Sequence, residues 1–148
     1  MTRKVKRTPE TRAAQGKLRT RFTLLPPDDL HPHERTVPEK VAELARALEH
    51  DGAIIRPVVV DEETLVVLDG HHRLAALRKL GCRQVPVILV DYSDPSIVVA
   101  TWREGEVPPT KEAVLLRALA GDVFEPKSTR HPVLNGLGHV KCKLTDLR

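Results

Sequence analysis

Apolar and polar residues alternate along this chain in a pattern that predicts short strands interleaved with helices. Residues 21–25 form the first predicted strand, and two β-branched runs at 57–60 and 65–68 flank a polar turn, which suggests a hairpin. Further strands are expected at 85–90 and 97–101, and an edge strand at 140–144.

Apolar residues recur every three or four positions in three other segments, which indicates three helices. The first lies between Thr36 and Gly52, and Thr36-Val37-Pro38-Glu39 has the form of a capping box that would begin it. The second covers residues 71–80 and the third residues 111–120, and a glycine follows each of them. Helices and strands in this order predict an α+β fold, a small mixed α/β sheet flanked by helices in a single domain.

Length and composition agree with one compact core. The chain has 148 residues, of which 41% are apolar and 30% charged, within the usual range for a single domain. It contains no apolar run of about 18 residues that would span a membrane, and no secretory signal pattern. Cys82 and Cys142 are far apart and have no ligand-like neighbours, so we expect no disulfide framework or zinc site. A cytoplasmic location follows as an expectation.

The net charge of +4 is unevenly distributed. Residues 1–20 carry seven of the 24 basic side chains and one of the 20 acidic ones, so the remaining 128 residues have a net charge of −2. We therefore expect residues 1–20 to be a basic, disordered arm, and residues 21–148 to be the folded domain. Such an arm offers only weak, salt-sensitive attraction to nucleic acid, and no membrane partner is expected.

The most informative motif joins the strand at 65–68 to the helix at 71–80. Its sequence is Asp69-Gly70-His71-His72-Arg73. A helix that begins directly after a strand presents free backbone N–H groups and the positive end of its dipole, which favour an anion. Gly70 would let a phosphate approach the backbone, and the basic side chains would bind it. Alternatively, Asp69 simply caps the helix and the other polar side chains are solvated.

A second motif, Lys127-Ser128-Thr129-Arg130-His131, combines cations and hydroxyls suited to a polyphosphate. On composition alone a polar loop with incidental charges is the better interpretation.

Two isolated residues complete the candidates. Glu34 ends a His-Pro-His-Glu loop just before the first helix, where a carboxylate can serve as a general base. Trp102, the only tryptophan, is either a core residue or a wall of a small-molecule pocket.

Taken together, these segments resemble the ParB/sulfiredoxin superfamily, and within it the ADP-dependent free-serine kinases. The resemblance runs from Phe22 to Leu147. It depends on the Asp-Gly-His-His-Arg and Lys-Ser-Thr-Arg-His strings occurring together with the upstream glutamate. It implies phosphoryl transfer from ADP to the hydroxyl of free L-serine, which gives O-phosphoserine and AMP.

The resemblance also implies a role for each candidate residue. Glu34 would be the catalytic base, Trp102 and His72 would contact serine, and Asp69 would hold Mg²⁺. The nucleotide phosphates would be bound by Gly70, His71, His72, Arg73, Lys127, Ser128, Thr129, Arg130 and His131. One departure concerns Lys40, which stands where relatives carry an acidic residue for serine recognition.

Other members of the superfamily suggest alternatives. A sulfiredoxin needs a cysteine in the phosphate turn, and His71 occupies that place here. A ParB-like nucleotide-gated DNA-partition protein needs a basic helix-turn-helix region, which the charge of residues 21–148 does not favour. A nucleotide sensor without catalytic turnover remains the third possibility.

Overall fold

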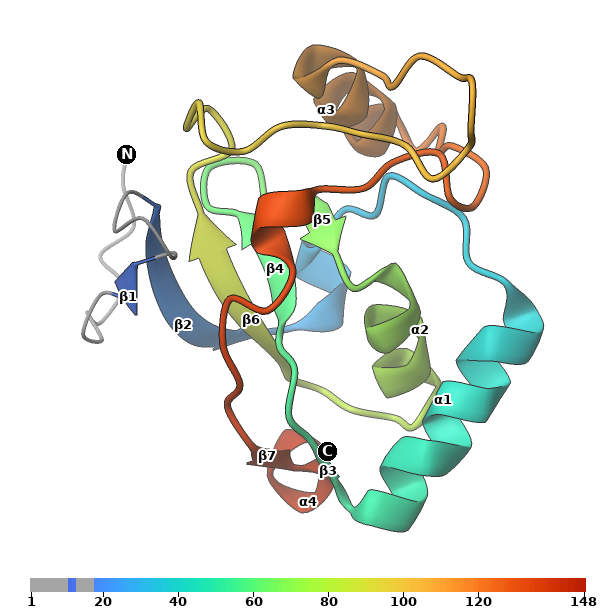
Figure 1. Ribbon diagram of the computed structural model, residues 1–148. Helices are drawn as coiled ribbons and strands as arrows, with labels where there is room; N and C mark the ends of the chain where they lie inside the picture. Colours follow the sequence, from blue (N-terminus) through green and yellow to red (C-terminus); the bar gives the residue numbers. More distant parts are fainter. Residues whose placement is uncertain (1–10, 13–17) are drawn as a thin grey trace.

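The computed structural model describes residues 11–12 and 18–148, which form a mixed sheet covered by helices on both faces (Figure 1). Most of the basic segment that we expect to be an arm, residues 1–10 and 13–17, lies outside the described residues. Leu18, which precedes the expected boundary at residue 21, is buried. Among the described residues, no helix combines the length and the apolar character needed to cross a bilayer.

The main sheet has five strands in the order β1-β2-β6-β4-β5. These strands are β1 (Thr11–Arg12), β2 (Arg19–Leu25), β4 (Val58–Asp61), β5 (Val67–Asp69) and β6 (Val85–Val90). β4 and β6 are parallel, whereas the other neighbours are antiparallel. The predicted hairpin at 57–68 is the β4–β5 pair.

In the part of the chain that the structure describes, four α-helices and a second, two-stranded sheet complete the fold. The helices are α1 (Pro38–Asp51), α2 (His71–Lys79), α3 (Lys111–Ala120) and α4 (Leu144–Leu147). The short sheet pairs β3 (Ala53–Ile54) with β7 (Cys142–Lys143), and two 3₁₀ turns are η1 (Pro27–Asp29) and η2 (Pro132–Leu134). The three helices expected from the sequence are therefore present, and α4 is additional.

Both faces of the main sheet are buried. Successive side chains of a strand point to opposite sides, so each central strand contributes to two cores. Val58 and Val60 of β4 lie in the core under α1, α2 and α4, whereas Val59 lies in a second core under α3. β6 alternates in the same way. This burial explains why the central strands are apolar at every position except Asp61, the last residue of β4.

Two local predictions are wrong, and a third is correct only in part. No capping box forms, since Val37 is the N-cap of α1 and no side chain caps it. Residues 97–101 do not form a strand, because only Ala100 pairs, through an isolated bridge to Arg130. The predicted edge strand at 140–144 shortens to β7, since Leu144 is buried and begins α4.

Candidate functional site

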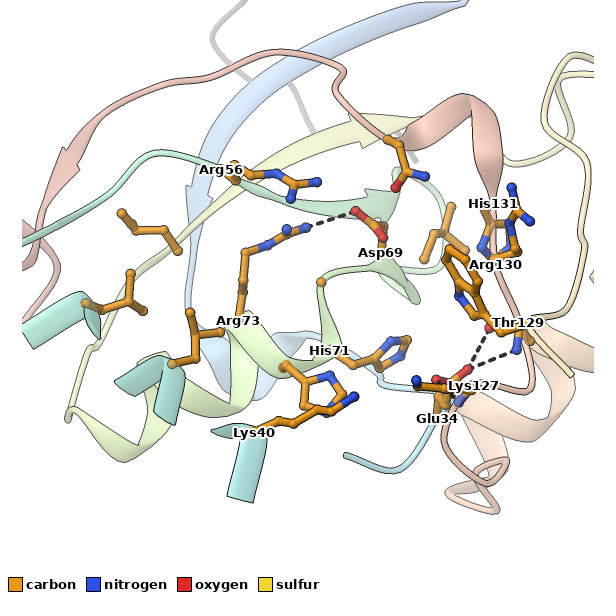
Figure 2. A pocket seen from close by; sticks show the side chains of 18 of the residues that line it. Glu34, Lys40, Arg56, Asp69, His71, Arg73, Lys127, Thr129, Arg130 and His131 are labelled. Atoms are coloured by element: carbon orange, nitrogen blue, oxygen red, sulfur yellow. Dashed lines mark hydrogen bonds and ion pairs between the residues drawn. The ribbon is translucent and has the colours of Figure 1, made fainter. Parts of the chain in front are cut away.

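A cavity of about 550 Å³ lies where β5 ends and α2 begins. Figure 2 shows Asp69 and Arg73 on one side of it and Glu34, Lys127 and Thr129 on the other. Arg73, Arg130 and Glu34, which are far apart in the sequence, thus share one cavity. Its lining consists of Glu34, Lys40, Leu44, Leu48, Ile54, Ile55, Arg56, Leu68, Asp69, Gly70, His71, His72, Arg73, Trp102, Lys127, Thr129, Arg130, His131 and Asn135.

The turn between β5 and α2 depends on glycine at position 70. Gly70 has φ +102°, and a Cβ atom there would lie 2.7 Å from Arg73 Nη2. Arg73 folds back over the turn, and its Nη2 donates to Asp69 Oδ2 at 2.9 Å. The N-cap residue of α2 is Gly70, and no side-chain capping hydrogen bond forms there. The alternative in which Asp69 caps α2 is therefore wrong. The N-terminus of α2 remains open to the cavity.

His71 and His72 fix the loop that carries Glu34. His71 Nε2 accepts from the His33 backbone N–H at 3.1 Å, and His72 Nε2 accepts from the Val37 N–H at 3.0 Å. Burial lowers the pKa of both rings, for His71 well below its ordinary value. Both rings are therefore neutral at pH 7, so they contribute no positive charge to the phosphate site that the sequence suggests.

Glu34 binds the backbone of the loop at 127–129. Its Oε2 accepts from the Lys127 N–H at 2.8 Å, and its Oε1 accepts from the Thr129 N–H at 3.1 Å and from Thr129 Oγ1 at 2.8 Å. Lys127 has φ +66°, a left-handed conformation that non-glycine residues adopt only when their surroundings enforce it. Glu34 supplies that constraint, and one acceptor position on Oε2 remains.

Two arginines that line the cavity each carry a donor atom that is unpartnered among the described residues. Arg73 Nε and Arg130 Nε are buried and have no hydrogen-bond partner within the described part of the chain. The Arg130 guanidinium stacks on Trp102, with its central carbon 4.5 Å from the ring centroid. Trp102 is 58% exposed, so it is a wall of the site rather than a core residue. Buried guanidinium donors without partners are suited to bind phosphate oxygens.

The remaining predicted residues face different surroundings. The Ser128 hydroxyl donates to the Glu125 carbonyl at 2.7 Å, and Ser128 does not line the cavity. The pKa of His131 is lowered to about 3 by burial and by the nearby His33. His131 Nε2 lies 2.9 Å from the Tyr92 hydroxyl, whose pKa is raised by burial.

The fit of Mg²⁺ depends on Asp69. Among residues 11–12 and 18–148, no three His, Cys, Asp or Glu side chains converge on a possible metal position. Mg²⁺ in phosphate sites is commonly held by one or two carboxylates together with phosphate oxygens. Asp69 lines the cavity, and its Oδ2 forms an ion pair with Arg73. The Oδ1 atom is the one that could bind a metal, so Asp69 fits a metal that takes most of its ligands from a nucleotide.

Sequence analysis missed the apolar end of the cavity. Leu44 and Leu48 of α1 and Ile54 and Ile55 beyond it line this end. Leu44 and Leu48 have the spacing of residues that face a core, so nothing in the sequence indicated that they line a cavity. In the structure, the 53% exposure of Ile55 distinguishes this surface from ordinary core. Lys40 of α1 also lines the cavity.

Residues 10–104 match the family described as the ParB N-terminal domain, which is more than half of the chain. The chain belongs to the ParB N-terminal domain family. This confirms the resemblance to the ParB/sulfiredoxin superfamily, together with the mixed fold.

Relatives of this ParB-type domain include named serine kinases. The chain is 36% identical over 83 residues to an ATP-dependent L-serine kinase of Staphylothermus marinus, a match that covers 53% of this chain and 33% of the relative. It is 30% identical over 79 residues to an ADP-dependent L-serine kinase of Thermococcus kodakarensis, covering 51% of this chain and 33% of the relative. The match thus spans about a third of each kinase.

A solved structure shares the fold of this ParB-type domain. The structure of a free serine kinase in complex with AMP superposes with a TM-score of 0.79 and 18% sequence identity. The superposition covers 86% of this chain and 93% of that chain. At this level of identity the likeness establishes the fold.

Proposed function

We propose that this protein is a small-molecule kinase that transfers a phosphoryl group from ADP to the hydroxyl of free L-serine, giving O-phosphoserine and AMP. The names of the serine kinase relatives support the reaction class, and they include both ATP- and ADP-dependent enzymes. The choice of ADP rests on the resemblance of the motifs.

The observation that carries this proposal is the presence of one carboxylate and two unpartnered guanidinium donors in a single cavity. Phosphoryl transfer requires mainly alignment of nucleophile and leaving group and neutralisation of phosphate oxygens. Glu34 lines the cavity together with Arg73 and Arg130, whose Nε atoms have no partner in the described structure. The cavity therefore holds the charges that this chemistry needs.

Each part of the cavity has a role in this mechanism. Arg73, Arg130 and Lys127 bind the phosphate oxygens, and Gly70 leaves room for the Arg73 guanidinium to lie against the turn at the start of α2. The apolar end that contains Leu44 accommodates the base of the nucleotide. Mg²⁺, held through Asp69, would neutralise charge on the diphosphate.

The reaction begins with serine held between the terminal phosphate and Glu34, where Trp102 walls the cavity. Glu34 Oε2 takes the proton of the serine hydroxyl, since among the described residues Oε2 accepts a single hydrogen bond. The serine oxygen bonds to the terminal phosphorus, and the bond from that phosphorus to the bridging oxygen breaks. AMP leaves with the electron pair of that bond.

The decisive experiment measures products from the purified chain with Mg²⁺, L-serine and either ADP or ATP. We expect phosphoserine and AMP with ADP, observed by ³¹P NMR. Glu34→Gln is expected to lose turnover and to retain ADP binding measured by calorimetry. Glu39→Gln is the matched control, because Glu39 lies in the exposed first turn of α1 outside the cavity.

Other outcomes would reject the proposal in distinct ways. ADP binding without product from L-serine would favour a nucleotide sensor. Retention on duplex DNA at about 0.15 M salt that survives deletion of residues 1–10, which leaves β1 and β2 in place, would favour a partition protein. Product from ATP alone would keep the kinase and correct the donor.

A further inference from the structure

A hydrogen-bonded chain of buried side chains lies beneath Glu34. His33 is 0% exposed. Its Nδ1 lies 2.7 Å from the Val67 carbonyl oxygen, and its Nε2 lies 2.8 Å from Thr129 Oγ1. The same Oγ1 lies 2.8 Å from Glu34 Oε1. Thr129 therefore connects the proposed base to a histidine that the reaction described above does not use.

The hydrogens of this chain can be assigned from the chemistry of each atom. A carbonyl oxygen only accepts, so His33 Nδ1 must carry a hydrogen and donate it to Val67. Burial lowers the pKa of His33 to about 4, so the ring is neutral at pH 7 and its Nε2 is a bare acceptor. The Thr129 hydroxyl has one hydrogen but two acceptors at 2.8 Å. It can serve only one of them at a time.

The charge on Glu34 decides which acceptor receives this hydrogen. An ionised carboxylate is the stronger acceptor, so Thr129 donates to Glu34 and leaves His33 Nε2 without a donor. A protonated carboxyl group accepts more weakly, and the hydroxyl then turns to His33. The Thr129 backbone N–H, 3.1 Å from Glu34 Oε1, holds the carboxyl group in place in both states.

The other titratable groups near His33 and Glu34 do not change which acceptor the Thr129 hydroxyl prefers. The rings of His71 and His131 face His33, with centroids at 4.5 and 6.0 Å. Burial lowers the pKa of both, so neither adds charge at pH 7. Lys127 and Arg130 are the cations of the loop that faces Glu34.

We propose that Thr129 is a positioning residue whose hydroxyl binds Glu34 while Glu34 is ionised and turns to His33 once Glu34 holds the substrate proton. This inference rests on the proposed role of Glu34 as the base. The proton stays on Glu34, and only the O–H bond of Thr129 rotates. A buried acceptor that lacks a donor before the reaction gains one as the proton arrives, which favours proton uptake.

The first test observes the hydroxyl without any need for activity. Glu34→Gln removes the charge, so the ¹⁵N resonance of His33 Nε2 is expected to move from the range of a bare nitrogen toward that of a hydrogen-bonded one. In the double variant with Thr129→Val the movement should vanish, and with Thr129→Ser it should persist. An unchanged resonance in Glu34→Gln would overturn the proposal, even if the protein proves to be a serine kinase.

The second test uses the pH profile of kcat/KM in the active enzyme. Thr129→Val removes a donor from ionised Glu34, so the acidic limb should move to higher pH by about one unit. His33→Phe removes the competing acceptor, so the same limb should move to lower pH. Thr129→Ser should keep the wild-type profile. If the acidic limb moves in the same direction in Thr129→Val and in His33→Phe, and both proteins are folded, Thr129 has a purely structural role.

The two tests separate this proposal from the proposed function. If His33→Phe does not fold, the ¹⁵N measurement on Glu34→Gln decides. A shifted resonance in a protein without kinase activity would retain the rotating hydroxyl and reject the kinase.

Discussion

Replacing Gly70 with alanine tests whether the turn between β5 and α2 positions a phosphate-binding arginine. Gly70 has φ +102°, and a Cβ atom would lie 2.7 Å from Arg73 Nη2 and 3.0 Å from its Nε. An alanine at positive φ costs about 1–2 kcal/mol, which lowers Tm by about 2–8 °C in a chain of this size. The guanidinium group must also move, which breaks its bond to Asp69.

The second effect is specific to the site. Loss of one charge-assisted hydrogen bond to a phosphate costs about 1.5–3 kcal/mol, so ADP binding should weaken about ten- to hundredfold. Gly121→Ala is the matched control, because Gly121 has φ +74° and its Cβ would meet nothing within 4 Å. It lies outside the cavity, so it should lose stability alone.

The assay combines thermal unfolding with calorimetric titration of ADP into Gly70→Ala, Gly121→Ala and the unmodified protein. We expect both variants to have a lower Tm and only Gly70→Ala to bind ADP more weakly. Equal ADP affinity in the two variants would refute the reasoning, since it would mean that the position of Arg73 does not matter for the nucleotide.

Two further predictions concern pH and the exposed tryptophan. The pKa of His33 is lowered to about 4 and that of His131 to about 3, so the unfolded chain takes up protons below pH 6.5 while the folded rings stay neutral. The free energy of unfolding should therefore fall as pH drops from 6.5 to 5.5, and a constant Tm over that range would contradict this. Trp102→Ala removes the ring stacked on Arg130, and about 1 kcal/mol of cation–π energy predicts ADP binding about fivefold weaker in a titration. Trp102→Phe should retain most of the ADP affinity. Val107→Ala, at a residue that is 90% exposed and outside the cavity, should leave ADP affinity unchanged.

Local patterns along the chain were sufficient to predict most of the elements. The apolar spacing in α1, α2 and α3 and the β-branched runs in β4 and β6 correspond to the observed helices and strands. The capping box failed because the Val37 N–H bonds to His72, 35 residues away. A contact of that kind depends on packing between α1 and α2, and it cannot be predicted from the residues of the motif alone.

The candidate site shows the same limit. Gly70 and Arg73 stand in one short string, so their association could be expected. In contrast, the backbone bonds from Lys127 and Thr129 to Glu34 join positions more than 90 residues apart. The neutral state of His71 could not be predicted either, since it follows from burial and from neighbouring rings of other segments.

The bonds that hold Glu34 have a consequence for sequence divergence. At positions 127 and 129 the main-chain amides do the holding, and every residue type except proline carries such an amide. The side chain at position 127 takes no part in these two bonds, although its positive φ disfavours β-branched residues there. Sequence change at this position can therefore alter the charge beside Glu34 without altering the two bonds that align its carboxylate.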